Sequence, residues 1–228
     1  MRRILEWENK RTFSLGRGSA IRLPGGPLKH HEEIKFQAER FSIRPYPQHL
    51  VKPWLLEDST ELLIRPIRSE DEPMMARFHA TLSERSVYLR YFHMLPLDAR
   101  IDHKRLTRIC FIDYEREMVL VAERHDPASG EREILAVGRL IREENAKEAE
   151  FAVLISDKFQ GHGLGTELLK RLIEIARADG LDRVTADILG ENRQMIEICK
   201  LLGFQLEYGG ESVIKAELDL RGSFKTPR

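Results

Sequence analysis

Residues 160–165 read Gln-Gly-His-Gly-Leu-Gly and stand between an apolar run at residues 151–155 and an amphipathic stretch that begins at Leu164. This order predicts a strand, a tight loop and a helix. The first N–H groups of a helix lack partners within the helix, and the helix dipole adds partial positive charge at that end. Gly163 and Gly165 permit a positive φ and let an oxygen approach closely. The segment can therefore hold a pyrophosphate.

Two well-known phosphate-binding motifs do not fit this segment. A Walker-type loop requires Gly-Lys followed by Ser or Thr, whereas Gly165 is followed by Thr166 and Glu167. A dinucleotide-binding loop requires Gly-x-Gly-x-x-Gly, whereas the glycines here alternate at positions 161, 163 and 165. The pattern that remains is Gln-x-x-Gly-x-Gly, and the alternative to phosphate binding is an ordinary connection between a strand and a helix.

With its flanks, this pattern resembles the acyl-CoA-dependent N-acetyltransferases of the GNAT superfamily. The resemblance runs from about Thr60 to Leu220 and includes the opening run at residues 64–71 and the stretch from Asn192 to Phe204. Residues 83–92 and 111–118 look like the acetyltransferase part of bacterial protein-lysine acetyltransferases, which there follows an acyl-CoA-synthetase-like region. The resemblance implies an α/β (α+β) fold, with a mixed, mostly antiparallel twisted sheet of six to seven strands and helices on both faces.

Acetyl transfer to an amine requires an uncharged nitrogen. A lysine with a pKa of about 10.4 is protonated at pH 7, and freeing its lone pair costs about 4.6 kcal/mol. A carboxylate that accepts the proton typically contributes ~10²- to 10⁴-fold in rate. Glu150 is the candidate base, because it lies ten residues before Gln160, where related enzymes often place this group. Its apolar neighbours would raise its pKa by desolvation; the alternative is a solvent-facing edge residue.

Asp187 is the second candidate for the base. It interrupts an apolar strand five residues before Asn192, a location that some superfamily members use for the same role. The alternative is that its side chain hydrogen-bonds the turn at Gly190.

The co-substrate that the resemblance implies is acetyl-CoA, with no metal. Backbone N–H groups of Val153, Leu154 and Ile155 would hold the pantetheine arm and stabilise charge on the acetyl carbonyl. Asn192 would contact the cofactor from the following helix, although it is also a suitable helix N-cap. The pyrophosphate would be bound by the loop residues Gln160, Gly161, His162, Gly163, Leu164, Gly165 and Thr166.

The sequence departs from the family pattern at two positions. His162 stands where many relatives have arginine or lysine, so charge against the phosphates becomes pH-dependent. Cys199 stands where many relatives have a tyrosine that protonates the departing thiolate; it is either a thiol donor or a buried apolar residue. The resemblance also suggests Tyr88, Tyr91, Asp113 and Tyr114 for the acceptor cleft, with the core as the alternative for the aromatic residues.

Periodicity and turn residues predict the elements that would position these groups. The predicted strands span residues 62–68, 118–123, 134–141, 149–155, 183–189, 204–208 and 213–220. The predicted helices are one capped by Asp71 and ending near Leu82, and others at residues 84–94, 98–110, 164–178 and 192–202.

Length and composition limit the possible classes. The 228 residues suffice for one acetyltransferase domain at residues 59–221, with a partly disordered arm at 1–58 and a tail at 222–228. The zero formal net charge disfavours nucleic-acid binding, and the absence of an 18-residue apolar run disfavours a membrane span. Two cysteines without motif spacing and the absence of a signal pattern indicate the cytoplasm. Polar residues 30–33 do not suggest a metal site.

The leading expectation is an N-acetyltransferase that uses acetyl-CoA and acts on a protein lysine, such as that of an acyl-CoA synthetase. One alternative is an N-acetyltransferase for a small-molecule amine. The other is a non-catalytic module that binds acyl-CoA and regulates a partner.

Overall fold

The computed structural model describes residues 45–126, 128–142, 147–208 and 212–221. Most of the expected N-terminal arm, with the polar stretch at residues 30–33, and the expected tail at 222–228 lie outside the described residues. In the described part, no helix combines the length and apolar composition needed to cross a bilayer.

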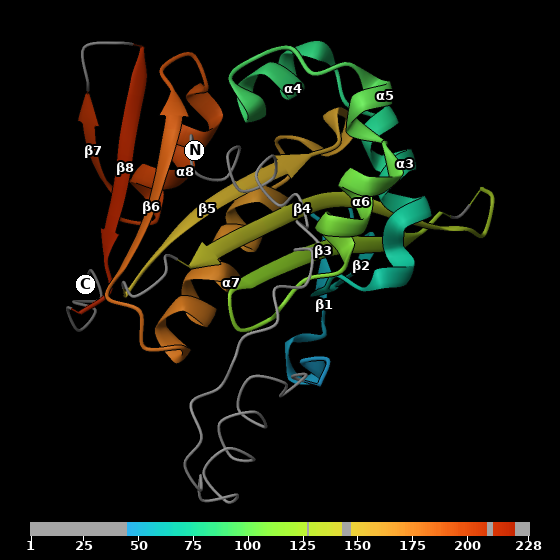
Figure 1. Ribbon diagram of the computed structural model, residues 1–228, viewed down its shortest axis with the longest axis horizontal. Coiled ribbons are helices and arrows are strands. Elements are labelled where there is room, and N and C mark those ends of the chain that lie inside the picture. Colours follow the sequence, from blue (N-terminus) through green and yellow to red (C-terminus); the bar gives the residue numbers. More distant parts are fainter. Residues whose placement is uncertain (1–44, 127, 143–146, 209–211, 222–228) are drawn as a thin grey trace, which may run out of the picture.

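An eight-stranded sheet forms the centre of the molecule (Figure 1). Its order is β1-β2-β3-β4-β5-β6-β8-β7, and every neighbouring pair is antiparallel except β5 and β6. The mixed, mostly antiparallel sheet is thus confirmed, with eight strands rather than six to seven. The strands are β1 Lys52–Leu55, β2 Glu61–Pro66, β3 Glu117–His125, β4 Arg132–Arg142, β5 Glu148–Ile155, β6 Arg183–Leu189, β7 Gln205–Tyr208 and β8 Val213–Asp219.

The additional strand is β1, which lies within the stretch expected to be the arm and pairs with β2. It contains Pro53, and proline is tolerated at the edge of a sheet because an edge strand does not need every N–H.

Helices cover both faces of the sheet (Figure 1). Val119 and Val121 of β3 pack with α3, α4 and α6, whereas Leu120 and Ala122 pack with α7, as alternation along a strand requires. The α-helices are α3 Glu72–Ala80, α4 Glu84–Tyr91, α5 Leu97–Arg100, α6 His103–Cys110, α7 Leu164–Ala178 and α8 Arg193–Leu201, and the short 3₁₀ turns are η1 Gln48–Leu50, η2 Ser69–Asp71 and η3 Asp157–Phe159.

The predicted helix at residues 98–110 is two helices, α5 and α6. The chain breaks at Ile101, and the carboxylate of Asp102 then accepts the N–H of Arg105 and starts α6. A good N-cap residue inside an apparently continuous pattern therefore marks a new helix.

Helix α7 lies close against the sheet. The predicted apolar positions Leu164, Leu168 and Leu172 are all fully buried. Beneath them, a Cβ on Gly138 of β4 would stand 3.2 Å from the Leu172 side chain. A glycine at this position lets the middle of α7 approach β4 closely.

Strands β5 and β6 are paired over only three positions. Glu148, Ala149 and Glu150 are in register with Arg183, Val184 and Thr185, and the pairing ends there. Beyond Glu150 the edge of β5 has no neighbouring strand among the described residues on that side. The parallel pair therefore opens into a V whose apex is Glu150.

A buried cluster of charges joins β2, β3 and η2. The guanidinium of Arg65 donates to both oxygens of Asp71 at 2.7 Å and, through Nε, to Glu123 at 2.7 Å. Burial alone would lower the pKa of Arg65, but the two carboxylates raise it. Asp71 occupies the expected N-cap position of α3, yet its side chain accepts Arg65 and the N–H of Arg68 instead of capping the helix.

We predict that Asp71→Ala lowers the free energy of unfolding by about 3–5 kcal/mol, because it leaves a buried guanidinium with one partner removed. Asp98→Ala, at an exposed aspartate of α5, should change it by no more than about 0.5 kcal/mol. Urea unfolding of both variants measures the difference. Equal losses would contradict a structural role for the Arg65 cluster.

Candidate active site

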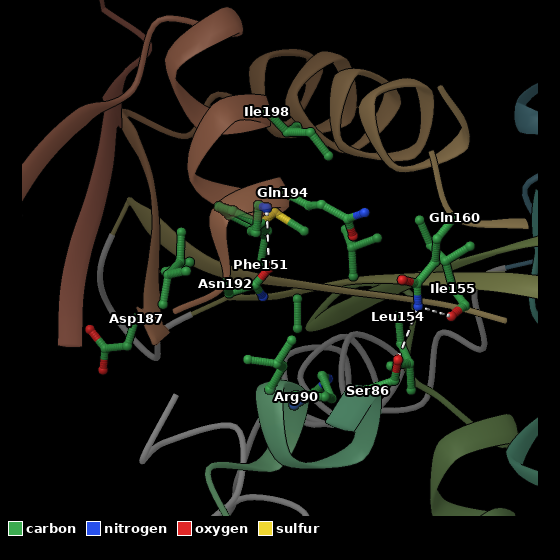
Figure 2. A pocket seen from close by; sticks show the side chains of 16 residues that line it. Ser86, Arg90, Phe151, Leu154, Ile155, Gln160, Asp187, Asn192, Gln194 and Ile198 are labelled. Atoms are coloured by element: carbon green, nitrogen blue, oxygen red, sulfur yellow. Dashed lines mark hydrogen bonds between the residues drawn. The ribbon is translucent and has the colours of Figure 1, made fainter. Parts of the chain in front are cut away.

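The V between β5 and β6 contains a cleft with about 720 Å³ of empty space, part of it open to solvent (Figure 2). It is walled by the two parted strands, by one face of α4, and by the start and inner face of α8. Its lining residues are Ser86, Leu89, Arg90, Phe151, Ala152, Val153, Leu154, Ile155, Gln160, Ala186, Asp187, Ile188, Asn192, Gln194, Met195 and Ile198.

The backbone of β5 presents alternate residues to this cleft. Ser156, which follows β5, donates its N–H to the carbonyl of Leu135 in β4. In a strand the N–H and C=O of successive residues point to opposite sides. The polar groups of Leu154 therefore face β4, whereas those of Val153 and Ile155 face the cleft. Of the three N–H groups expected to hold the pantetheine arm, only those of Val153 and Ile155 face the cleft. Leu154 contributes its side chain to the lining instead.

The glycine loop has the conformation that its sequence predicts. Gly161 and Gly163 have φ values of 82° and 78°, in the left-handed region that favours glycine. Gly163 is the N-cap of α7 and offers no side-chain capping bond, and the first intrahelical bond runs from Glu167 N–H to Gly163 O. The N–H groups at the start of α7, from Leu164 to Thr166, therefore lack partners within the helix.

Gly165 allows α7 to begin directly beside the cleft. A Cβ at this position would stand 2.9 Å from Cδ1 of Ile155 and 3.2 Å from Cδ1 of Ile198. Both isoleucines line the cleft, so a glycine here keeps the helix N-terminus close to the cleft wall. His162, in the same loop, is exposed to solvent.

Gln160 links the loop to the end of β5. Its amide Nε2 donates to the carbonyl of Ile155 at 3.1 Å and to Oγ of Ser86 on α4 at 3.0 Å (Figure 2). The carbonyl of Ile155 faces the cleft but already accepts the bond from Gln160. Of the two backbone polar groups of Ile155, only the N–H is therefore left to bind a ligand.

Glu150 lies at the apex of the V and is 9% exposed. Its side chain shares a face of β5 with Ala152 and Leu154, which is the face covered by α4. It is not part of the cleft lining, but Phe151 and Ala152 next to it are. Burial raises the pKa of Glu150, and the charge of Asp187 raises it further, while that of Arg90 opposes the rise.

Asp187 lines the cleft from β6 (Figure 2). Glu150 and Thr185 are in parallel register, and Asp187 follows Thr185 by two residues, so both carboxylates are on the same face of the sheet. The N–H of Gly190 donates to Ser212 O. The turn therefore does not depend on Asp187 for that bond.

Asn192 caps α8 and also lines the cleft. Its Oδ1 accepts the N–H of Met195 at 3.2 Å. Cys199 is fully buried in the core beneath α8, and burial raises its pKa to about 12. The apolar alternative for Cys199 is confirmed.

Sequence reasoning missed the α4 wall of the cleft, formed by Ser86, Leu89 and Arg90, and the Gln194, Met195 and Ile198 positions of α8. Among the aromatic residues suggested for the acceptor cleft, Tyr91 is buried in the core and Tyr114 donates its hydroxyl to Ile67 O. In the described ranges, no three His, Cys, Asp or Glu side chains gather as metal ligands would.

Comparison with known proteins agrees with the family resemblance seen in the sequence. The family model of the GNAT acetyltransferase domain matches residues 61–205. The chain is 32% identical over 149 residues to acetyltransferase PA5475 of Pseudomonas aeruginosa, covering 65% of this chain and 77% of that protein. It is 34% identical over 88 residues to acetyltransferase Pat of Mycolicibacterium smegmatis, covering 38% of this chain and 26% of that one.

A solved structure of the GNAT domain of S. lividans PAT superposes with a TM-score of 0.67 and 28% identity. The match covers 77% of this chain and all of that domain.

We predict that Glu150→Gln makes the protein more stable at pH 8. The raised pKa means that the folded state holds this proton more tightly than the unfolded state does, so stability falls as pH rises from the ordinary value of 4.5 through the raised value. The gain should vanish below about pH 4.5. Urea unfolding across pH measures it, and Glu148→Gln, which loses an ion pair with Arg183, should show no gain. An unaltered stability of Glu150→Gln at pH 8 would contradict the raised pKa.

Proposed function

The chain belongs to the GNAT acetyltransferase family, and we propose that it transfers the acetyl group of acetyl-CoA to the side-chain amine of a protein lysine. As a member of this family it is an acyl-CoA-dependent N-acyltransferase. The observation that carries the proposal is the V between β5 and β6, which has the buried carboxylate of Glu150 at its apex and the glycine loop at its open end.

Acetyl-CoA would lie along the open edge of β5. The N–H and C=O of Val153 and the N–H of Ile155 would pair with the amides of the pantetheine arm, as a further strand would. The N–H groups from Leu164 to Thr166, at the positive end of the α7 dipole, would hold the pyrophosphate. Together these contacts would direct the thioester towards Glu150.

Glu150 is the general base in this proposal. Its raised pKa brings a carboxylate closer to the pH at which it must accept a proton, and improves it as a base relative to an ordinary glutamate. Asp187, which lines the cleft itself, would attract the incoming ammonium group and help to place it. The ammonium group loses a proton to Glu150, directly or through water, and the neutral amine attacks the acetyl carbonyl; the C–S bond of the resulting tetrahedral intermediate then breaks and releases the thiolate of coenzyme A. The cleft-facing backbone N–H groups of β5 would stabilise the negative charge that develops on the carbonyl oxygen.

The departing thiolate does not receive its proton from Cys199, because that thiol is buried away from the cleft. The thiolate of coenzyme A is a fair leaving group and can take a proton from water. Cys110 and Cys199 are both buried free thiols. This state fits the reducing cytoplasm that we propose as the location.

A protein lysine is favoured as the acceptor for two reasons. Residues 83–92 and 111–118 resemble the acetyltransferase part of protein-lysine acetyltransferases, and residues 84–91 form α4, whose inner face walls the cleft. The similarity to proteins named Pat supports the same class. An acyl-CoA synthetase that carries an acceptor lysine is the partner we propose.

We predict that the protein acetylates such a synthetase with acetyl-CoA, and does so faster than it acetylates polyamines or free amino acids. Glu150→Gln should lose about 10²- to 10⁴-fold in kcat while binding acetyl-CoA normally, because only the proton transfer is removed. Mass spectrometry of the acceptor and calorimetry with acetyl-CoA measure these effects.

The control for this prediction is Asp187→Asn. It should raise the KM for the amine, because Asp187 helps to place it, but keep most of kcat and shift the acidic limb of the pH–rate profile to lower pH, since removing a like charge lowers the pKa of Glu150. If Asp187→Asn abolishes turnover and Glu150→Gln does not, Asp187 is the base. If small amines react faster than the synthetase, the protein-lysine assignment is wrong.

We also predict that Gly163→Ala weakens acetyl-CoA binding by about tenfold, equivalent to about 1.4 kcal/mol, because it strains the loop that presents the N–H groups. Gly180→Ala is its matched control. Gly180 has a φ of 71° and open space around its Cβ position, but it follows the far end of α7. Both variants should lose about 1 kcal/mol of stability. Equal acetyl-CoA affinities in the two variants would contradict binding at the Gly163 loop.

A further inference from the structure

Asp157 lies just beyond β5, in η3, and reaches across to the start of α4. Its Oδ2 accepts the N–H of Ser83 at 2.8 Å, and its Oδ1 accepts the hydroxyls of Ser83 at 2.6 Å and Ser86 at 2.9 Å. Ser83 is itself the N-cap of α4 and accepts the N–H of Ser86. A single carboxylate therefore ties the helix that walls the acceptor side of the cleft to the loop that leads to Gly163.

The chain of hydrogen bonds continues to the strand that would hold acetyl-CoA. Oγ of Ser86 accepts from the amide of Gln160, and the same amide nitrogen donates to the carbonyl of Ile155 (Figure 2). The partners are 71–74 residues apart in sequence at the contacts between α4 and this loop. The network thus spans α4, η3, the glycine loop and the end of β5.

The direction of these bonds depends on the carboxylate. An ionised carboxylate only accepts, so the hydroxyl of Ser86 must donate to Asp157 and use a lone pair for Gln160. Burial tends to raise the pKa of Asp157, but the bonds from Ser83 and Ser86 outweigh it and leave the pKa below its ordinary value. The group therefore stays ionised at neutral pH, and Gln160 must turn its NH₂ towards Ser86 and Ile155.

We propose that Asp157 is a positioning residue for acetyl-CoA. It fixes the amide of Gln160 on the carbonyl of Ile155 and so decides where the pairing between β5 and the pantetheine arm ends. It also holds α4 at a constant distance from the glycine loop. The proposal rests on the proposed use of the β5 edge by acetyl-CoA, and it adds a residue that does not touch the reacting atoms.

The test is Asp157→Asn, which keeps the size of the side chain but introduces an NH₂ that opposes the donor direction of Ser86. We expect the Kd and KM for acetyl-CoA to rise about tenfold, with kcat changed less than threefold and the pH–rate profile unaltered. The matched control is Asp126→Asn. Asp126, like Asp157, accepts three hydrogen bonds, here two from the backbone N–H groups of Ala128 and Ser129 and one from the Ser129 hydroxyl, but it lies in the turn between β3 and β4. Asp126→Asn should therefore leave the Kd and KM for acetyl-CoA unchanged.

A double-mutant cycle with Ser86→Ala separates positioning from simple helix capping. If both residues act through Gln160, their effects on the Kd for acetyl-CoA should be strongly non-additive. A normal Kd and KM in Asp157→Asn, even with a lower melting temperature, would overturn the proposal, as would equal effects in Asp126→Asn. A wild-type protein that binds acetyl-CoA but acetylates no amine would contradict the proposed function and leave the binding test valid.

Discussion

The end of the pairing between β5 and β6 at Glu150 and Thr185 is the constraint on which the site depends. Between its two edge strands the rest of the sheet pairs its backbone groups with neighbouring strands, as buried polar groups require. Past Glu150 the facing edges separate, and polar groups of Val153 and Ile155 stand along a cleft. A ligand that carries amides along an extended chain can complete this edge. The last paired position of β5 carries the buried carboxylate of Glu150, which is the base in our proposal.

The position of Glu150 is costly for stability and useful for proton transfer, and both effects come from desolvation. A carboxylate with a raised pKa destabilises the folded protein at neutral pH, so the surrounding structure must supply the stability. The packing of Leu168 and Leu172 of α7 on Gly138 is one such source, and neither leucine lines the cleft.

Much of this arrangement follows from local sequence patterns. The loop at Gly163, the helix α7 after it and the strand that contains Glu150 are visible because glycine positions and helical periodicity are local signals. The α4 wall and the role of Asp157 are not, since the face of α4 that meets β5 and the partners of Asp157 depend on contacts between residues more than 70 positions apart. The sequence does not show which backbone groups of β5 face β4. Only the pairing with β4 shows that the N–H of Leu154 faces that strand, whereas those of Val153 and Ile155 face the cleft. β1 was missed because a short edge strand with Pro53 has almost no periodic pattern.

Amide hydrogen exchange on β5, with and without coenzyme A, is the most direct test that the parted edge is the binding surface. Exchange reports whether each N–H is hydrogen-bonded. The N–H groups of Val153 and Ile155 should exchange fast in the free protein and become protected when coenzyme A is bound. The N–H of Leu154, which faces β4, should be protected in both states. If coenzyme A leaves the exchange of Val153 and Ile155 unchanged while protecting amides elsewhere, the cleft between β5 and β6 is not where the acyl carrier binds.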